Sequence, residues 1–300
     1  MLRKSLSILI TVAFAITLAA AADNPISPSA LSASQIVDKN VAARGGLQAW
    51  RGVQALTYTG NLGVGGNQRQ PLPVTVPGRK VNPLSLAPSR RAEEVQLPFV
   101  MELARPRKLR FELQFRGQTA LQVFDGANGW KLRPYLNRLE VEPYTPEEMN
   151  VASMQADLDG YLVDYAAKGT KVELVGMDKV EDRNTYKVKL TMKDGKSLQV
   201  WIDAQTFLEA KVEGTPRRLD GVYHPVEIYY RDYRPVNGLQ IPFLLETKVL
   251  PVNKTATGYR DTPVPVEKIV VEKVVVNPRL DPSAFSKPQV AAAAATTTTK

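Results

Sequence analysis

The segment from Arg105 to Pro134 limits the fold of this chain more than any other part of its sequence. Between Leu109 and Phe115, apolar residues occupy every second position, and charged or amide residues occupy the positions between them. This two-residue period is typical of a strand with one apolar and one solvated face. One face of the predicted sheet must therefore contact something apolar.

The same segment continues as further strands. Arg116-Gly117-Gln118 is a turn candidate, and Leu121 and Val123 carry the alternation on after it. Two more turn candidates, each an Asx-Gly pair, precede Trp130. The pattern predicts an antiparallel meander with a continuous apolar lining.

Strand signals also fill most of the remaining sequence. Alternating or β-branched runs lie at 56–62, 97–103, 172–174, 186–192, 198–202, 208–212, 226–230, 241–245 and 269–276. Many hairpins and few helices predict a mainly β protein of about eleven strands, whose antiparallel sheet curls into a closed or partly open barrel. We expect a sheet of that size to enclose a cavity.

Two helices are predicted. The first begins near Ser34, places Ile36, Val37 and Val41 on one face and stops at a double glycine. The second opens at 145–148 with Thr-Pro-Glu-Glu, a cap followed by proline and two carboxylates. Its apolar stripe reaches Tyr165, which predicts four to five turns, with a break at Gly160 as the alternative. That stripe fits either a lid over a lipid or plain core packing.

Residues 1–22 resemble a secretory signal peptide, with two basic residues, an uncharged stretch and three alanines ending at Ala22. We expect cleavage near Ala22 and a periplasmic protein, although an uncleaved anchor is the alternative. Residues 23–33 are a predicted linker, and 34–285 form the predicted domain. Residues 63–91 are predicted to form a loop inserted into the sheet, and 286–300 a disordered tail.

The chemistry available to the chain is limited. It has no cysteine and a single histidine, His224, so thiol catalysis, disulfides and the usual zinc sites are excluded. No nucleophile elbow, phosphate loop or dinucleotide motif is present, and we predict no catalytic residue, metal or cofactor. Paired carboxylates leave a glycoside hydrolase as a third hypothesis. The pairs are Glu93-Glu94, Glu147-Glu148, Asp157 with Asp159, and Asp178 with Glu181-Asp182.

The charge pattern bears on partners. Without Arg3 and Lys4, 37 basic residues face 30 acidic ones, a net charge of about +7. The basic residues are spread along strand faces, so we predict no nucleic-acid partner, while weak attraction to anionic lipid surfaces stays open.

Two stretches resemble the LolA/LolB-like family of periplasmic lipoprotein carriers. The first is residues 102–134, with Arg-Pro at a strand end, a Lys-x-Arg-Phe strand, Asp-Gly and tryptophan. The second runs from residue 159 through DYRPVNGLQIPF and is similar to outer-membrane lipoprotein-sorting proteins. The resemblance covers most of residues 33–285. It implies an unclosed antiparallel β-barrel covered by a helical lid.

The resemblance also implies a role for Arg105. In the carriers, the arginine of the Arg-Pro pair lies inside the barrel and holds the lid shut through backbone carbonyls. Strand parity places Arg105 on the same face as the alternate residues from Leu97 to Leu103. A guanidinium has five hydrogen-bond donors, which need acceptors when the group is buried. The alternative is that Arg105 ends a strand and reaches solvent.

Our leading hypothesis is a binding or carrier protein for acyl chains of lipoproteins or other lipids. The alternative is an envelope sensor or scaffold that binds a protein partner with the same fold. We expect a monomer, with membrane-bound loading and acceptor proteins as further partners. The predicted cavity lining is Phe99, Met101, Leu103, Phe111, Leu113, Phe115, Leu121, Val123, Trp130, Met154, Leu158 and Phe243, with Arg105 as the lid latch.

Overall fold

The computed structural model describes residues 31–65, 94–219, 221–252 and 264–289. The predicted signal peptide, most of the predicted 63–91 loop and the end of the predicted tail lie outside these ranges. All the described elements belong to one compact unit that begins at Ser32.

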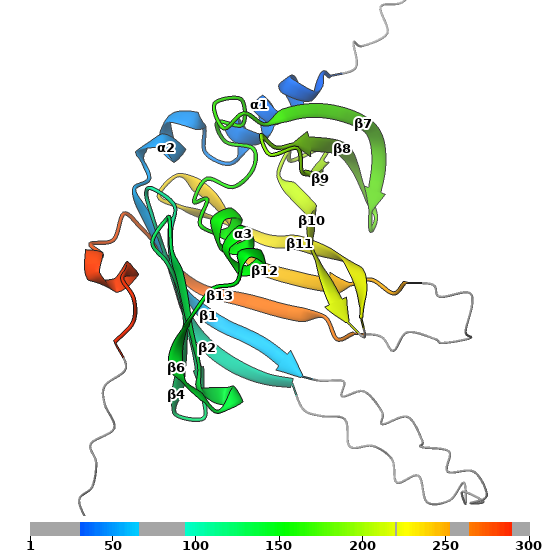
Figure 1. Ribbon diagram of the computed structural model, residues 1–300. Coiled ribbons are helices and arrows are strands. Elements are labelled where there is room, and N and C mark those ends of the chain that lie inside the picture. The colour runs from blue at the N-terminus through cyan, green and yellow to red at the C-terminus, as the bar shows by residue number, and fades with distance from the viewer. Residues whose placement is uncertain (1–30, 66–93, 220, 253–263, 290–300) are drawn as a thin grey trace, which may run out of the picture. The chain divides into compact units, whose positions relative to one another are not determined.

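Thirteen strands form a single sheet (Figure 1). They are β1 (Ala55–Gly65), β2 (Glu94–Ala104), β3 (Lys108–Phe115), β4 (Gln118–Phe124), β5 (Gly129–Arg133), β6 (Arg138–Pro143), β7 (Lys171–Val180), β8 (Arg183–Thr191), β9 (Ser197–Asp203), β10 (Glu209–Leu219), β11 (Val222–Val236), β12 (Leu239–Val249) and β13 (Glu267–Val276). The helices are α1 (Ala33–Ala43), α2 (Leu47–Gly52) and α3 (Pro146–Gln155), with short 3-10 turns η2 (Pro134–Leu136) and η3 (Pro282–Phe285).

The sheet consists of two meanders joined by one strand. Its order is β6-β5-β4-β3-β2-β1-β13-β12-β11-β10-β9-β8-β7, and neighbouring strands run antiparallel. Strands β1 to β6 pair in chain order, as do β7 to β12, and β13 lies between β1 and β12. No ladder joins edge strands β6 and β7, so the described sheet is unclosed. The predicted mainly β, unclosed architecture is confirmed, with β6 as a strand that the sequence reading did not contain.

The helices differ in part from those predicted. Ser32, two residues before the predicted cap, closes a capping box on α1, and Ile36 and Val37 are fully buried. Helix α3 begins at the predicted Thr145 cap but ends at Gln155. The prediction of four to five turns was wrong, because α3 stops at Gln155 and the chain does not continue as a helix through Gly160 and Asp164, which adopt positive φ. Helix α2 was not predicted.

The junction between the two meanders contains a close approach of backbones at Gly60. The β1–β13 register shifts at Thr59/Gly60, which marks a bulge. A Cβ atom built on Gly60 would lie 2.0 Å from the Val270 carbonyl oxygen and 2.9 Å from the Val271 Cα. Only glycine therefore fits at this point of the ladder.

We expect Gly60→Ala to lower the free energy of unfolding by about 3 kcal/mol, since both clashing atoms belong to backbone that cannot rotate away. The melting temperature should fall by roughly 6–12 °C, measured by circular dichroism. Gly52→Ala is the matched control, because a Cβ atom there meets nothing within 4 Å. Equal melting temperatures for the two variants would contradict the tight β1–β13 contact.

Candidate functional site

The face of the sheet that meets α3 can be followed through the strand register. Directly paired residues on adjacent antiparallel strands have their side chains on the same face. Tyr58 pairs with Met101, Met101 with Phe111, Phe111 with Gln122 and Gln122 with Lys131. We call this the inner face, because the Lys131 ammonium binds Glu148 of α3. The opposite side is the outer face.

The inner face is apolar and only partly covered by described residues. Phe99 and Leu103 are buried, and the rings of Phe99 and Phe111 stack with centroids 5.7 Å apart. Met101, Phe111, Leu113 and Phe115 each remain partly exposed. Four predicted lining residues on β2 and β3 therefore form a continuous apolar strip that other described side chains do not fully bury.

Three predicted lining residues lie on the outer face instead. Leu121 pairs with Glu112, Val123 with Arg110 and Trp130 with Val123, all in ladders of the opposite parity to Phe111. The prediction that they share the lining was wrong. Arg116 and Gly117 form a two-residue hairpin loop in which both φ angles are positive, so Phe115 faces Gln118. A loop of two residues reverses the odd-even parity, and the even-numbered positions of β4 continue the inner face.

The outer face at this point has its own cover. Arg110 donates to the Ala284 carbonyl oxygen over 3.0 Å, which holds η3 against β3. Phe285 of η3 is buried and lies 5.9 Å from the Lys108 ammonium. Val123 is fully buried beside Arg110 in the ladder. Val123 is thus buried on the outer face, on the strand next to the one that contacts the C-terminal turn.

Helix α3 is held on the inner face by a buried lysine. Lys131 is 6 % exposed, and its ammonium lies 2.6 Å from the Glu148 Oε1 atom. The same carboxylate accepts from the Thr145 amide in the capping box that starts α3. Burial by itself raises the pKa of Glu148, but the hydrogen bonds from Lys131 and Thr145 outweigh it and hold that pKa below its usual range.

Residues 156–170, which follow α3, form the post-α3 segment. This segment buries Leu158, Leu162 and Val163, whereas Met154 at the end of α3 stays partly exposed. The predicted apolar stripe of the second helix is therefore divided between α3 and irregular chain.

Phe243, the remaining predicted lining residue, is buried in β12 with the Arg234 guanidinium 4.5 Å from its ring centroid.

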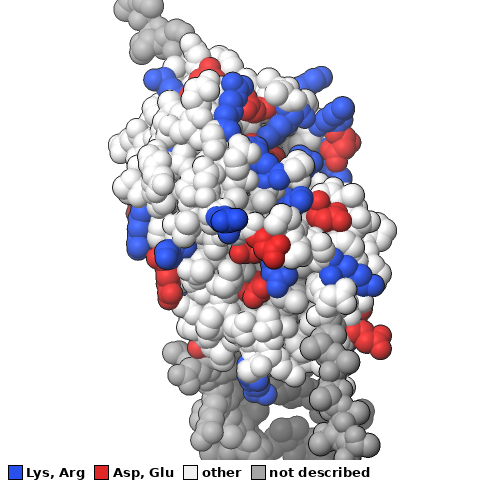
Figure 2. All heavy atoms as spheres, turned by 90° about the vertical axis from the view of Figure 1, so that its left-hand side faces the viewer, with Lys and Arg blue, Asp and Glu red and all other residues white. Residues whose placement is uncertain are grey.

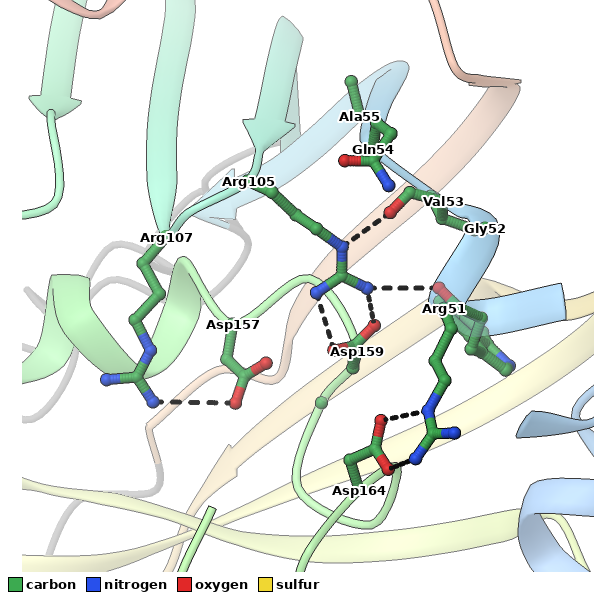
Figure 3. A network of polar contacts seen from close by, with 12 residues as sticks. Arg51, Gly52, Val53, Gln54, Ala55, Arg105, Arg107, Asp157, Asp159 and Asp164 are labelled. Carbon is green, nitrogen blue, oxygen red and sulfur yellow. Dashed lines mark hydrogen bonds and ion pairs between the residues drawn. The ribbon is translucent and has the colours of Figure 1, made fainter. Parts of the chain in front are cut away.

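Arg105 connects three separate parts of the molecule (Figure 3). Its Nε atom donates to the Val53 carbonyl over 2.7 Å, and its Nη2 atom to the Trp50 carbonyl over 3.1 Å. The guanidinium also binds both carboxylate oxygens of Asp159, at 3.0 and 2.5 Å. The Asp159 side chain is only 6 % exposed. The two carbonyls lie at the end of α2, and Asp159 belongs to the post-α3 segment.

Further ion pairs hold the same segment. Arg51 binds Asp164 through two hydrogen bonds of 3.0 and 2.6 Å. Arg44 donates to the Asp159 backbone carbonyl over 3.0 Å. The Lys168 ammonium lies 2.9 Å from Asp157 Oδ1 and 2.7 Å from a backbone carbonyl in the segment. The post-α3 segment is thus fastened by directional, charge-assisted contacts in addition to the burial of its apolar side chains.

Two tyrosines lie deep on the sheet without being closely packed. Burial raises the pKa of Tyr58 to about 12, with Arg44 opposing the shift, and raises the pKa of Tyr230 above its usual range. Both side chains nevertheless remain partly exposed.

The catalytic candidates are engaged elsewhere. Asp157 and Asp159 are bound by Lys168 and Arg105, and Glu148 by Lys131. His224 is buried with its Nδ1 atom 3.0 Å from the Leu250 carbonyl oxygen. Within the described ranges, no group of three or more acidic or histidine side chains is arranged to hold a metal ion. None of the helices in those ranges has the length and apolarity needed to cross a membrane.

The sequence matches no family model and no curated protein. The structure, however, is similar to a LolA superfamily protein from Nitrosomonas europaea, with a TM-score of 0.51, 12 % identity and coverage of 86 % of this chain and 99 % of that one. It is also similar to a DUF1329 family protein from Desulfovibrio piger, with a TM-score of 0.50, 11 % identity and coverage of 85 % and 98 %. These similarities establish a LolA-like fold, as the sequence resemblance predicted.

Removal of Arg105 should be far more costly than removal of an exposed arginine. Arg105→Leu leaves the Asp159 carboxylate buried without its main partner, so we expect a loss of about 3 kcal/mol in the free energy of unfolding. Asp159→Asn combined with Arg105→Leu should lose at least about 1 kcal/mol less than the two single losses added together. Urea unfolding monitored by circular dichroism measures all three variants.

Arg51→Leu and Asp164→Asn provide the matched control cycle on the more exposed pair, where each change should cost below about 1 kcal/mol. Strictly additive losses at Arg105 and Asp159 would mean that their ion pair does not hold the post-α3 segment.

The anchor of α3 should depend on pH. Because the pKa of folded Glu148 lies below its ordinary value of 4.5, the ionised carboxylate stabilises the folded protein above that pH, and the contribution disappears as pH falls through the lowered pKa. Glu148→Gln should therefore cost on the order of 1 kcal/mol at pH 7 and progressively less toward pH 3. Urea unfolding across this pH range tests it, and a loss independent of pH would refute the assignment.

Proposed function

We propose that the protein binds acyl chains of lipids or lipoproteins on the inner face and carries them through the periplasm. The observation that carries the proposal is the apolar strip of Met101, Phe111, Leu113 and Phe115, which stays partly exposed beneath a helix held by polar contacts. Burial of chain methylenes against such a strip would contribute about 0.8 kcal/mol each. Binding of this kind needs no directional recognition of the chain.

The contacts over the strip support reversible access. Helix α3 and the post-α3 segment are held by Glu148, Asp159 and Asp164 through their ion pairs with basic residues. The Arg51–Asp164 pair is more exposed and can be exchanged for water at modest cost, whereas the buried Arg105–Asp159 pair opens only when another group replaces the lost partner. Arg105, at the centre of these contacts, is accordingly proposed as the latch. The periplasmic location rests on the predicted signal peptide.

A binding role is better supported than the glycoside hydrolase hypothesis. Glycoside hydrolysis requires one carboxylic acid and one carboxylate facing an open cleft. Asp157 and Asp159, the predicted pair nearest the sheet interior, instead serve as ion-pair acceptors for Lys168 and Arg105. On the face in Figure 2, basic and acidic side chains are interspersed, which does not favour a nucleic-acid partner.

Edge strand β7 favours a second candidate function, docking of a protein partner. Val175 and Met177 are 53 % and 59 % exposed there. An unpaired strand edge with exposed apolar side chains is a template for strand addition. Mass spectrometry of the natively purified protein separates the candidates, because bound lipid supports the carrier and a co-purified polypeptide without lipid supports the docking role.

Phe111→Gln should weaken binding of dodecanoate by about five- to thirtyfold, corresponding to roughly 1–2 kcal/mol of lost apolar contact. Leu121→Gln is the matched control, because Leu121 is also apolar and partly exposed but lies on the outer face of the adjacent strand. Isothermal titration calorimetry with octanoate, decanoate and dodecanoate should give about fourfold tighter binding per added methylene. Affinity that is independent of chain length, or equal losses in both variants, would contradict the proposed function.

A further inference from the structure

A hollow of about 300 Å³ lies beside the post-α3 segment and has a cationic lining. Three parts of the chain form it: the β2–β3 turn at Arg107, residues 150–170 around the end of α3, and the β8–β9 turn at 192–196. The volume corresponds to roughly ten water molecules and is at the lower limit of small-molecule sites. It therefore suits a polar headgroup and is too small for a complete lipid.

Two of the four cations in the hollow already have close partners. Lys168 lies 2.8 Å from Asp157, and Lys196 lies 2.8 Å from Asp194. These four residues include both carboxylates of the lining. Each of the two acidic side chains of the lining thus has a lysine as its close partner.

Arg107 and Lys193 supply charge that these carboxylates do not match. Arg107 is 54 % exposed and makes only long contacts, 3.8 Å to Asp157 and 3.4 Å to the Ser153 hydroxyl. The stem of Lys193 lies against Gly169, 3.3 to 3.6 Å from where a Cβ would stand, and no close carboxylate partner for its ammonium occurs among the described residues. The lining therefore has a net charge of +2, carried by an arginine and a lysine from separate turns.

The remaining wall relates the hollow to the inner face. Met154, Met192 and Tyr161 line it on the apolar side. Burial raises the pKa of Tyr230 of β11 above its usual range, and Tyr161 adds to this shift. Tyr230 pairs with Leu245, Leu245 with Ile269 and Ile269 with Leu62, in the same ladder system as the inner face. A ligand could therefore place an anionic group in the hollow and an apolar chain toward the sheet.

We propose that this hollow binds the phosphate headgroup of an anionic lipid through Arg107 and Lys193. A phosphomonoester carries up to two negative charges and several acceptor oxygens, which match two cations without a close carboxylate partner better than the single charge of a carboxylate does. Arginine and lysine from two turns would approach the phosphate from different sides. The inference rests on the proposed function, because it assigns the headgroup of a ligand whose chains lie on the inner face.

The test compares three probes by isothermal titration calorimetry on the purified protein, with the short-chain lipids below their micelle concentrations. Dihexanoyl phosphatidic acid has both the phosphate and the chains, dihexanoyl phosphatidylcholine has the same chains with a zwitterionic headgroup, and glycerol 3-phosphate has the phosphate alone. We expect phosphatidic acid to bind about tenfold tighter than phosphatidylcholine, and glycerol 3-phosphate to bind more weakly than phosphatidic acid.

Arg107→Gln combined with Lys193→Gln should abolish most of the preference for phosphatidic acid and leave phosphatidylcholine binding unchanged. Arg218→Gln combined with Lys179→Gln removes the same charges from exposed positions outside the hollow and should keep the preference. Melting temperatures confirm that both double variants are folded.

The outcomes separate the two proposals. Equal binding of the two lipids, or a preference that survives in the Arg107 and Lys193 variant, overturns the headgroup site while leaving chain binding intact. Glycerol 3-phosphate binding as tightly as phosphatidic acid identifies a site for free phosphate esters, which overturns the lipid assignment. If neither lipid binds to the wild-type protein, the result counts against the proposed function itself.

Discussion

The bidentate ion pair between Arg105 and Asp159 is the contact on which the arrangement of the inner face depends. It joins the end of β2, the last carbonyls of α2 and the post-α3 segment at one guanidinium. Hydrogen bonds to the backbone of one element and the carboxylate of another fix both at once, which apolar packing alone does with less directionality. The nearby pairs of Arg51 with Asp164 and Lys168 with Asp157 extend this fastening along the segment.

Lys131 of β5 connects α3 to the sheet. A lysine is expensive to bury, and its position on the inner face is compatible with folding only because Glu148 lies opposite it. Glu148 at the same time caps the helix to which it belongs. Formation of α3 and its attachment to the sheet are therefore coupled through one carboxylate. An apolar residue at 131 would remove the directional contact between Glu148 and the sheet.

The sequence contains enough local information for most strands but not for the site. Alternation reveals β2 and β3 because each strand has one apolar face, and the Thr145 cap reveals the start of α3. Helix α2 has only six residues, from just after Gly46 to Gly52, and its order comes from burial of Trp50, a tertiary effect that no local period records. The outer-face position of three predicted lining residues could have been predicted from the sequence, because a two-residue Arg-Gly loop after Phe115 already implies the reversed parity of β4. Asp159, in contrast, lies 54 residues from Arg105, and only the topology brings them together.

The place of β13 has a consequence for how the molecule is assembled. Strands β1 to β6 and β7 to β12 are each joined by contacts close in sequence, so either half can grow by successive hairpins. The strand that unites them follows both in the chain and must enter between β1 and β12, with partners about 210 residues apart in the β1 ladder. Until it arrives, each half presents an open edge at β1 or β12. Pairing of the two meanders therefore depends on the last strand of the chain, so the thirteen-stranded sheet is completed only when β13 has formed both of its ladders.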